Sequence, residues 1–269
     1  MTSATPPAEK SPPSAPAEAA PLISIRGIWK KLGGQDVLKG FDLDVPTGQT
    51  TVILGRSGGG KSVLLKHIIG LMKPDKGEVL VDGESIVPLS ERQLSRVRKK
   101  IAILFQSAAL FDSMTVEDNI AFPLREAGMK DLGEIDAKVA HALELVDLAG
   151  EQQKMPEKLS GGMRKRVGLA RAIVTEPRCI LYDEPTTGLD PIVADSINRL
   201  IRRLQKRLGI TSIVVTHDMK SAFHVADQVA YLYDGRVYFS GTPEALRAST
   251  DPLVHDFIEG RSRELRSDE

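Results

Sequence analysis

Cysteine is almost absent from this chain, which has one, Cys179, among 269 residues. A single cysteine excludes an internal disulfide and is typical of a protein kept in a reducing compartment such as the cytosol. Long apolar runs are also missing, since none approaches the roughly 18 to 20 residues that a membrane-spanning helix needs. No basic segment at the start leads into an apolar one, so we expect no secretory signal. If the protein acts at a membrane, we expect other chains to hold it there.

Net charge is missing too, because Lys plus Arg and Asp plus Glu both number 36. Without an overall basic field, nucleic acid is not expected as the main partner. Hydrophobic residues make up 41% of the chain, enough to bury a sizeable core. The length predicts one large domain with a subdomain.

The chain divides into three parts by composition. Residues 1–21 are mostly Pro, Ala, Ser, Thr and Glu, which predicts a disordered tail. We expect a globular domain over 22–241 and a helical extension over 242–269. In the extension, Asp251 can cap a short helix that begins at Pro252. Its apolar stripe consists of Leu253, Val254, Phe257 and Ile258. The stripe packs either on its own domain or across on a second copy of the chain.

Strand and helix patterns alternate through the globular part. Phe41, Leu43 and Val45 alternate with aspartates, as in a half-buried strand. Continuous apolar runs predict buried parallel strands, and amphipathic stretches predict helices between them. The expected strands are 51–54, 78–81, 179–182, 213–216 and a hairpin over 229–239, and the expected helices include 63–72 and 191–208. The pattern predicts an α/β fold with a mostly parallel core sheet, an N-terminal antiparallel portion and a helical subdomain over about 90–165.

A glycine-rich segment follows the strand at 51–54 and fits the pattern G-x-x-x-x-G-K-[ST]. Its residues are Gly55, Arg56, Ser57, Gly58, Gly59, Gly60, Lys61 and Ser62, with Val63 directly after them. Glycines let successive N–H groups curl around phosphate oxygens, and the following helix adds its positive end. Lys61 is expected to reach the β- and γ-phosphates, and Ser62 to bind Mg²⁺. The alternative is a glycine-rich turn that binds nothing.

Two carboxylates, Asp183 and Glu184, follow the apolar run 179–182. Ligands of parallel sheets gather at the carboxyl ends of the strands, where this pair is predicted to lie. Asp183 is placed to hold Mg²⁺, and Glu184 to orient or deprotonate an attacking water. Alone, such a pair is often only a solvated turn.

Leu159–Met163, sequence LSGGM, precedes an amphipathic helix and resembles the signature loop of ABC ATPases, with Met163 where that family usually has Gln. Gln106 resembles the family's Q-loop glutamine, Asp190 its D-loop aspartate and His217 its switch histidine. All six motifs stand in the family's order. The chain is therefore similar to ABC transporter ATP-binding subunits from about residue 22 to 241.

The resemblance implies a mechanism in which two copies face each other head to tail around ATP and Mg²⁺. The phosphate loop of one copy and Ser160, Gly161 and Gly162 of the other would enclose each ATP. Gln106 would sense the γ-phosphate through Mg²⁺, and His217 would contact the γ-phosphate. Asp190 would lie beside the nucleotide.

An aromatic residue that stacks on adenine is expected before the phosphate-loop strand in this family. The aligned position holds Leu32, with Trp29 three residues earlier. Apolar contact replaces stacking only in part, so we expect weak selectivity between ATP and GTP. Trp29 is predicted to belong to the core instead.

Two segments resemble the ATPases of Mla/Mce-type lipid transporters, namely 60–71 and 159–173, and so does the ending 251–260. The resemblance implies phospholipid cargo, integral membrane permease subunits, an Mce-type lipid-binding subunit and a place on the cytoplasmic face of a bacterial inner membrane. Two alternatives stay open: an importer ATPase for a small polar nutrient, and a non-transport ABC ATPase. The absence of zinc-type cysteines, sustained heptads and a second motif set argues against the latter.

Residues 107–118 hold Leu110, Phe111 and Met114 close together in a predicted loop. If these side chains are exposed beside Gln106, they mark a docking site for a helix of the membrane subunit. The alternative is that they pack inside the helical subdomain.

Overall fold

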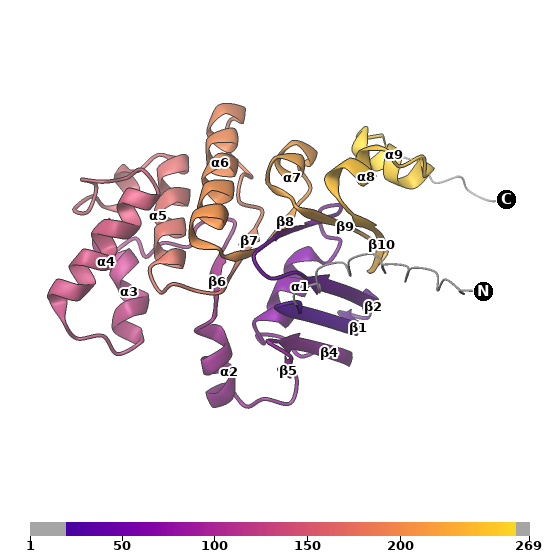
Figure 1. The fold of residues 1–269 in the computed structure, drawn as a ribbon, viewed down its shortest axis with the longest axis horizontal. Helices are drawn as coiled ribbons and strands as arrows, with labels where there is room; N and C mark the ends of the chain where they lie inside the picture. Colours follow the sequence, from indigo (N-terminus) through magenta and orange to yellow (C-terminus); the bar gives the residue numbers. More distant parts are fainter. Residues whose placement is uncertain (1–19, 262–269) are drawn as a thin grey trace, which may run out of the picture.

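A six-stranded sheet forms the centre of the molecule in the computed structural model, which describes residues 20–261 (Figure 1). The strand order is β10-β9-β3-β8-β7-β6, and all neighbours are parallel except the edge pair β9 and β10. The strands are β3 (Thr50–Leu54), β6 (Ile101–Leu104), β7 (Cys179–Asp183), β8 (Thr211–Thr216), β9 (Gln228–Tyr233) and β10 (Arg236–Gly241). The predicted mostly parallel core sheet is confirmed.

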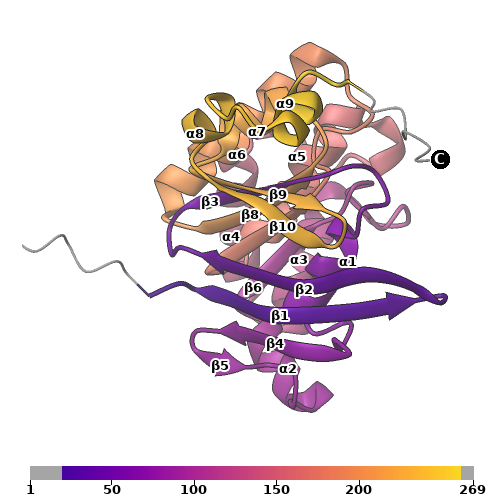
Figure 2. The ribbon, with the colours of Figure 1, turned by 90° about the vertical axis from the view of Figure 1, so that its right-hand side faces the viewer.

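A second, antiparallel sheet with the order β2-β1-β4-β5 lies against the first (Figure 2). Its strands are β1 (Ile23–Leu32), β2 (Gln35–Val45), β4 (Lys76–Val81) and β5 (Glu84–Ser85). Phe41, Leu43 and Val45 are buried while the aspartates between them are exposed, as the alternation predicted. The hairpin tip between β9 and β10 touches this sheet, because the Lys39 N–H donates to the Gly235 carbonyl at 2.9 Å.

Helices cover both faces of the core sheet. They are α1 (Lys61–Ile68), α2 (Glu91–Arg98), α3 (Val116–Glu126), α4 (Leu132–Leu145), α5 (Gly161–Ile173), α6 (Pro191–Leu208), α7 (Met219–Val225), α8 (Pro243–Arg247) and α9 (Pro252–Ile258), with a 3₁₀ turn at Pro156–Lys158. The α6 bounds match the prediction. Asp190 caps it by accepting from the Ile192 and Val193 N–H groups, and Gly209 ends it with φ of 62°.

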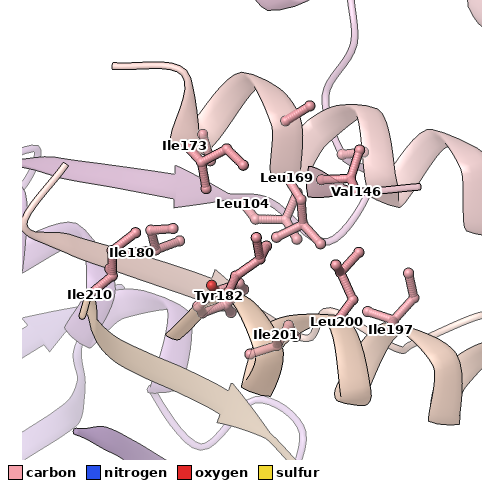
Figure 3. Packing of buried hydrophobic residues seen from close by; sticks show 14 of the residues in the cluster. Leu104, Val146, Leu169, Ile173, Ile180, Tyr182, Ile197, Leu200, Ile201 and Ile210 are labelled. Atoms are coloured by element: carbon pink, nitrogen blue, oxygen red, sulfur yellow. The ribbon is translucent and has the colours of Figure 1, made fainter. Parts of the chain in front are cut away.

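Side chains of α5 and α6 meet over the sheet in one apolar core. In Figure 3, Leu169 and Ile173 of α5 face Ile180 and Tyr182 of β7, and Ile201 of α6 lies beside Tyr182. Each of these residues is almost completely buried. Burial of one such aliphatic side chain stabilises a fold by about 1.5–3 kcal/mol, so this cluster fixes the ends of β7 and of α5 relative to each other.

Helices α3, α4 and α5 gather at one end of the molecule (Figure 1). The helical region therefore runs over 116–173 rather than the expected 90–165, which is a correction at both boundaries. Strand β6 lies inside the expected range but belongs to the core sheet, where it pairs with β7. The helical pattern at 91–98 does not belong to this region, because α2 is a short helix that directly precedes the core strand β6.

The two ends of the chain differ in what they contact. Leu22, where the globular part is predicted to begin, is buried, and its N–H donates to the Val45 carbonyl at 3.0 Å. The predicted disordered tail, apart from its last residues, lies outside the described part of the chain. Helix α9 packs on its own domain, where Val254 is buried and Phe257 stacks on Tyr231 with ring centroids 4.4 Å apart. The other three residues of the stripe, Leu253, Phe257 and Ile258, are only partly buried, so contact with a second copy stays a prediction.

Within residues 20–261, the helices are all too short or too polar to cross a bilayer.

Candidate functional site

The glycine-rich loop connects the carboxyl end of β3 to the first turn of α1. Gly60 adopts φ of 98°, and a Cβ there would lie 2.9 Å from the Val37 Cγ1 atom. Gly58 also has positive φ, at 75°. A side chain at either position would strain the loop. Gly60 precedes α1 without a side-chain cap, so the first N–H groups of the helix are available to an anion.

Lys61 lies folded back into the loop that precedes it. Its Nζ donates to the Gly55 carbonyl at 2.8 Å and to the Arg56 carbonyl at 3.1 Å. It also lies 3.3 Å from Glu184 Oε1, and the residue is only 5% exposed. A buried ammonium held by carbonyls and one carboxylate is placed to transfer its contacts to incoming phosphate oxygens.

The predicted carboxylate pair sits at the carboxyl end of β7, beside the loop. Ser62 Oγ donates to Asp183 Oδ1 at 2.9 Å, which joins the two residues expected to bind the metal. Burial raises the pKa of Asp183, the charge of Glu184 adds to that rise, and the Ser62 hydrogen bond opposes it. A carboxylate that is costly to ionise alone is a favourable partner for a cation.

Glu184 is held by several polar groups in a left-handed backbone conformation with φ of 48°. His217 Nδ1 lies 3.0 Å from both carboxylate oxygens, and the hydroxyls of Thr216 and Thr187 donate to Oε2 at 3.2 and 3.3 Å. Burial acts to raise the pKa of Glu184, but the hydrogen bond from His217 and the charge of Lys61 outweigh it and lower the pKa. Such a strained, ionised carboxylate is suited to orient a water.

Oxygen donors at this edge fit Mg²⁺ in number and type. Ser62 and Asp183 offer a hydroxyl and a carboxylate oxygen side by side. The described residues contain no cluster of three or more His, Cys, Asp or Glu side chains that would hold a metal unaided. Mg²⁺ usually keeps waters and substrate phosphates as its other ligands, so two protein donors beside a phosphate loop are sufficient.

A second group of predicted residues lies at the start of α5. Ser160 caps this helix by accepting from the Met163 N–H at 3.2 Å. A Cβ on Gly162 would come within 2.6 Å of Val193 Cγ1, so glycine is required where α5 approaches α6. Asp190 caps α6 beside Val193, so the predicted signature and D-loop residues of one chain lie next to each other.

Gln106 follows β6, and its side chain is exposed. Its backbone carbonyl accepts a short hydrogen bond from the buried ammonium of Lys165 in α5. Nearby, Phe111 is 42% exposed and its ring lies 4.8 Å from that of Phe122. Leu110 and Met114 are partly buried, so both alternatives for this segment hold in part.

Comparison with known proteins shows the family. Residues 38–187 match the family model described as ABC transporter. The chain belongs to the ABC transporter ATPase family. Three relatives support this assignment over most of the chain. MlaF of Escherichia coli strain K12, named an intermembrane phospholipid transport system ATP-binding protein, is 42% identical over 90% of each chain. The probable ribonucleotide transport ATP-binding protein mkl of Mycobacterium leprae is 42% identical over 89% of this chain and 69% of the relative. A solved dimeric ATP-binding cassette bound to ADP and Pi is 32% identical, with a TM-score of 0.75 over 82% of this chain and 98% of that one.

The predicted site residues of this ABC ATPase therefore fall into three groups. The phosphate loop, Asp183, Glu184 and His217 are joined by contacts within one copy. Ser160, Gly161, Gly162 and Asp190 form a second group and Gln106 a third. The chain is an ATPase that serves as the ATP-binding subunit of an ABC transporter.

The adenine side of the ABC site holds one correction. Trp29 is 39% exposed and is not a core residue as expected. Its indole lies on Gly40 of β2, where a Cβ would be 3.3 Å from Nε1. Leu32 is 36% exposed at the end of β1 and pairs with Gln35 across the hairpin. The indole buries part of its apolar surface on β2 rather than in the core.

Several residues that shape the site have no signal in the motifs. Thr216 and Thr187 hold Glu184, and Asn119 of α3 fixes the 111–115 turn by bonding the carbonyls of Phe111, Met114 and Thr115 at 3.0–3.1 Å. A hydroxyl directly before the switch histidine is the one hint that the sequence offers. Lys165 stands among three consecutive basic residues and could not be separated from them.

Proposed function

We propose that this ABC ATPase powers phospholipid transfer between membranes of a bacterial cell envelope. The match to MlaF along 90% of both chains carries the proposal. A relative from Haemophilus influenzae with the same printed function matches 91% of its own length at 43% identity. Agreement over 90% of this chain extends beyond residues 38–187, which match the ABC transporter model.

A polar cargo is the second candidate, because the mkl relatives carry a ribonucleotide transport name at similar identity. Those relatives are covered over only 69–70% of their length, so part of each has no counterpart here. Coverage of 90% of MlaF, against 69–70% of the mkl relatives, favours phospholipid. The two cargos differ enough in chemistry for one transport assay to separate them.

The ATPase step is proposed to occur between two copies. The phosphate loop of one copy binds the ATP phosphates, and Ser160, Gly161 and Gly162 of the other close over the γ-phosphate. Glu184 accepts a hydrogen bond from the attacking water while His217, 3.0 Å away, holds its carboxylate. Mg²⁺, held by Ser62 and Asp183 with help from Gln106, would neutralise charge on the phosphates.

Separate membrane subunits are proposed to bind beside Gln106, because Phe105 and Phe111 expose apolar surface on both sides of that residue. We therefore propose that the protein acts on the cytoplasmic face of the inner membrane, together with a permease and an Mce-type lipid-binding subunit. Crosslinking from a cysteine at position 111, with Cys179→Ser, should capture the permease. An active complex without this crosslink would contradict the docking site.

The cargo experiment uses the ATPase purified with the membrane proteins encoded beside it. Donor vesicles with labelled phospholipid and unlabelled acceptor vesicles should exchange label faster with ATP. Glu184→Gln should retain ATP binding, lose at least about a hundredfold in turnover and form an ATP-dependent dimer on a sizing column. Turnover stimulated by ribonucleotides and unaffected by lipid would favour the polar cargo instead.

A further inference from the structure

Helix α5 contacts the loop that follows β6 through three residues spaced three apart. Lys165 donates to the Gln106 carbonyl. Arg171 donates to the carbonyls of Ala108 and Ala109 at 2.7 and 2.8 Å. Between them, a Cβ on Gly168 would lie 2.7 Å from Leu104 Cδ1 and 3.2 Å from Ala108 Cβ. The helix thus lies directly on the loop and carries a cation on each side of the closest approach.

The loop itself has a conformation that needs such support. Ala108 and Ala109 both have left-handed φ, 61° and 45°, although neither is glycine. Each non-glycine residue in this region costs about 1 kcal/mol or more, and it persists only where surrounding contacts hold it. Two consecutive residues of this kind turn their carbonyls toward one side, where the Arg171 guanidinium bonds both.

Lys165 is unusual for a helix side chain because it is only 5% exposed. Burying an ammonium is costly unless acceptors compensate. Within residues 20–261, its one hydrogen bond goes to the Gln106 carbonyl, 59 positions away in the sequence. The charges of Asp183 and Glu184 also act on this ammonium, but the Gln106 carbonyl is the acceptor that ties it to the loop, so separation of helix and loop would break this charge-assisted hydrogen bond.

The two ends of this contact belong to different nucleotide sites. In the proposed two-copy mechanism, Gln106 would face the nucleotide of its own copy, whereas Ser160 at the start of α5 would face the nucleotide of the other copy. We propose that Lys165, Gly168 and Arg171 clamp residues 105–111 to α5, so that loop and signature residues move as one body when ATP binds. The clamp would transmit the state of both sites to the exposed Phe111. This inference rests on the proposed two-copy mechanism.

The test is hydrogen exchange in the full chain on the Glu184→Gln background, with and without ATP. Lys165→Met removes the charge and keeps the stem. Without ATP it should speed exchange of residues 105–111 about tenfold, the change expected for one lost charge-assisted hydrogen bond. With ATP, protection should persist at 160–164 and be lost at 105–111, while ATP affinity changes less than about twofold.

Matched variants separate the clamp from a general loss of stability. Lys165→Arg keeps a cation and should restore most of the protection. Lys138→Met removes a lysine of α4 that pairs with Glu176 at 2.7 Å, outside the loop, and should leave both segments unchanged. Unchanged exchange at 105–111 in Lys165→Met, or equal loosening throughout the domain, would overturn the clamp.

Failure of the two-copy mechanism gives a different result. If ATP protects neither segment of the Glu184→Gln protein, the signature residues do not close over nucleotide and the proposed function is wrong. The comparison without ATP still decides whether Lys165 holds the loop.

Discussion

The phosphate loop and the 105–111 loop are both built around a buried lysine, and the two lysines are equally exposed, 5% each. Lys61 bonds the carbonyls of its own loop, five and six positions earlier. Lys165 bonds a carbonyl 59 positions away. The contacts of Lys61 lie within one short segment of the sequence. The contact of Lys165 forms only when α5 packs against the loop that follows β6. Local motifs therefore reveal where nucleotide binds, whereas tertiary contacts determine how the binding is transmitted.

Substitution of Lys61 should have the largest effect and sharpen this contrast. Lys61→Ala removes the cation from the phosphate cradle, so ATP affinity should fall by about a hundredfold or more. Equilibrium dialysis with ATP measures this directly. Lys165→Met serves as the comparison, with near-normal affinity. Similar losses in both variants would show that the two lysines do one task.

A second contrast concerns stability. Contacts between residues far apart in the sequence, such as those of Asp227, should contribute more to the free energy of unfolding than the local contacts of Lys61. Asp227 accepts from the Arg202 guanidinium at 2.6 and 2.7 Å and from the Thr50 N–H at 2.9 Å. These contacts tie α6 and the segment before β9 to β3. Asp227→Asn should lower the free energy of unfolding by about 2 kcal/mol at pH 7. Lys61→Ala should change it much less.

The pH dependence of this loss has a defined sign. Burial acts to raise the pKa of Asp227, but the Arg202 hydrogen bond outweighs it and lowers the pKa below its usual 3.8. A lowered pKa contributes stability above the unfolded value, and that stability is lost as pH falls through the folded value. Urea unfolding should therefore show the two proteins converging below about pH 4. A difference that stays constant down to pH 2 would assign the effect to shape rather than charge.

The sequence predicted the elements whose signals are local. The α6 bounds, the hairpin over β9 and β10 and the alternation in β2 follow from caps, turn residues and periodicity. The helical region was misplaced because the assignment of β6 to the core sheet depends on pairing with β7, 75 or more positions later. Trp29 was misassigned because its environment comes from Gly40 on the neighbouring strand. Contacts of this kind leave no mark at either position alone.

Adenine recognition should show the smallest change in affinity. It tests whether Leu32, at the family's stacking position, or the nearby Trp29 contacts the base. Leu32 stands where the family usually stacks an aromatic ring, and it ends β1 next to the hairpin. Two residues beyond its partner Gln35, Val37 reaches the phosphate loop, since its carbonyl lies 3.3 Å from where a Cβ of Gly60 would be. We therefore expect Leu32, on the strand paired with β2, to contact a bound base, while Trp29 is held against Gly40.

Replacement of Leu32 by tyrosine should tighten ATP binding by about threefold to tenfold, the range of one aromatic stacking contact. Competition between ATP and GTP should show weak discrimination in the parent protein and stronger preference for ATP in Leu32→Tyr. Leu208→Tyr is the matched control, because Leu208 is similarly exposed, 39% against 36%, but ends α6 away from the loop. A parent protein that already prefers ATP strongly, and loses that preference in Trp29→Ala, would contradict this prediction. The indole would then leave Gly40 to stack on the base, and Trp29 rather than Leu32 would set the selectivity.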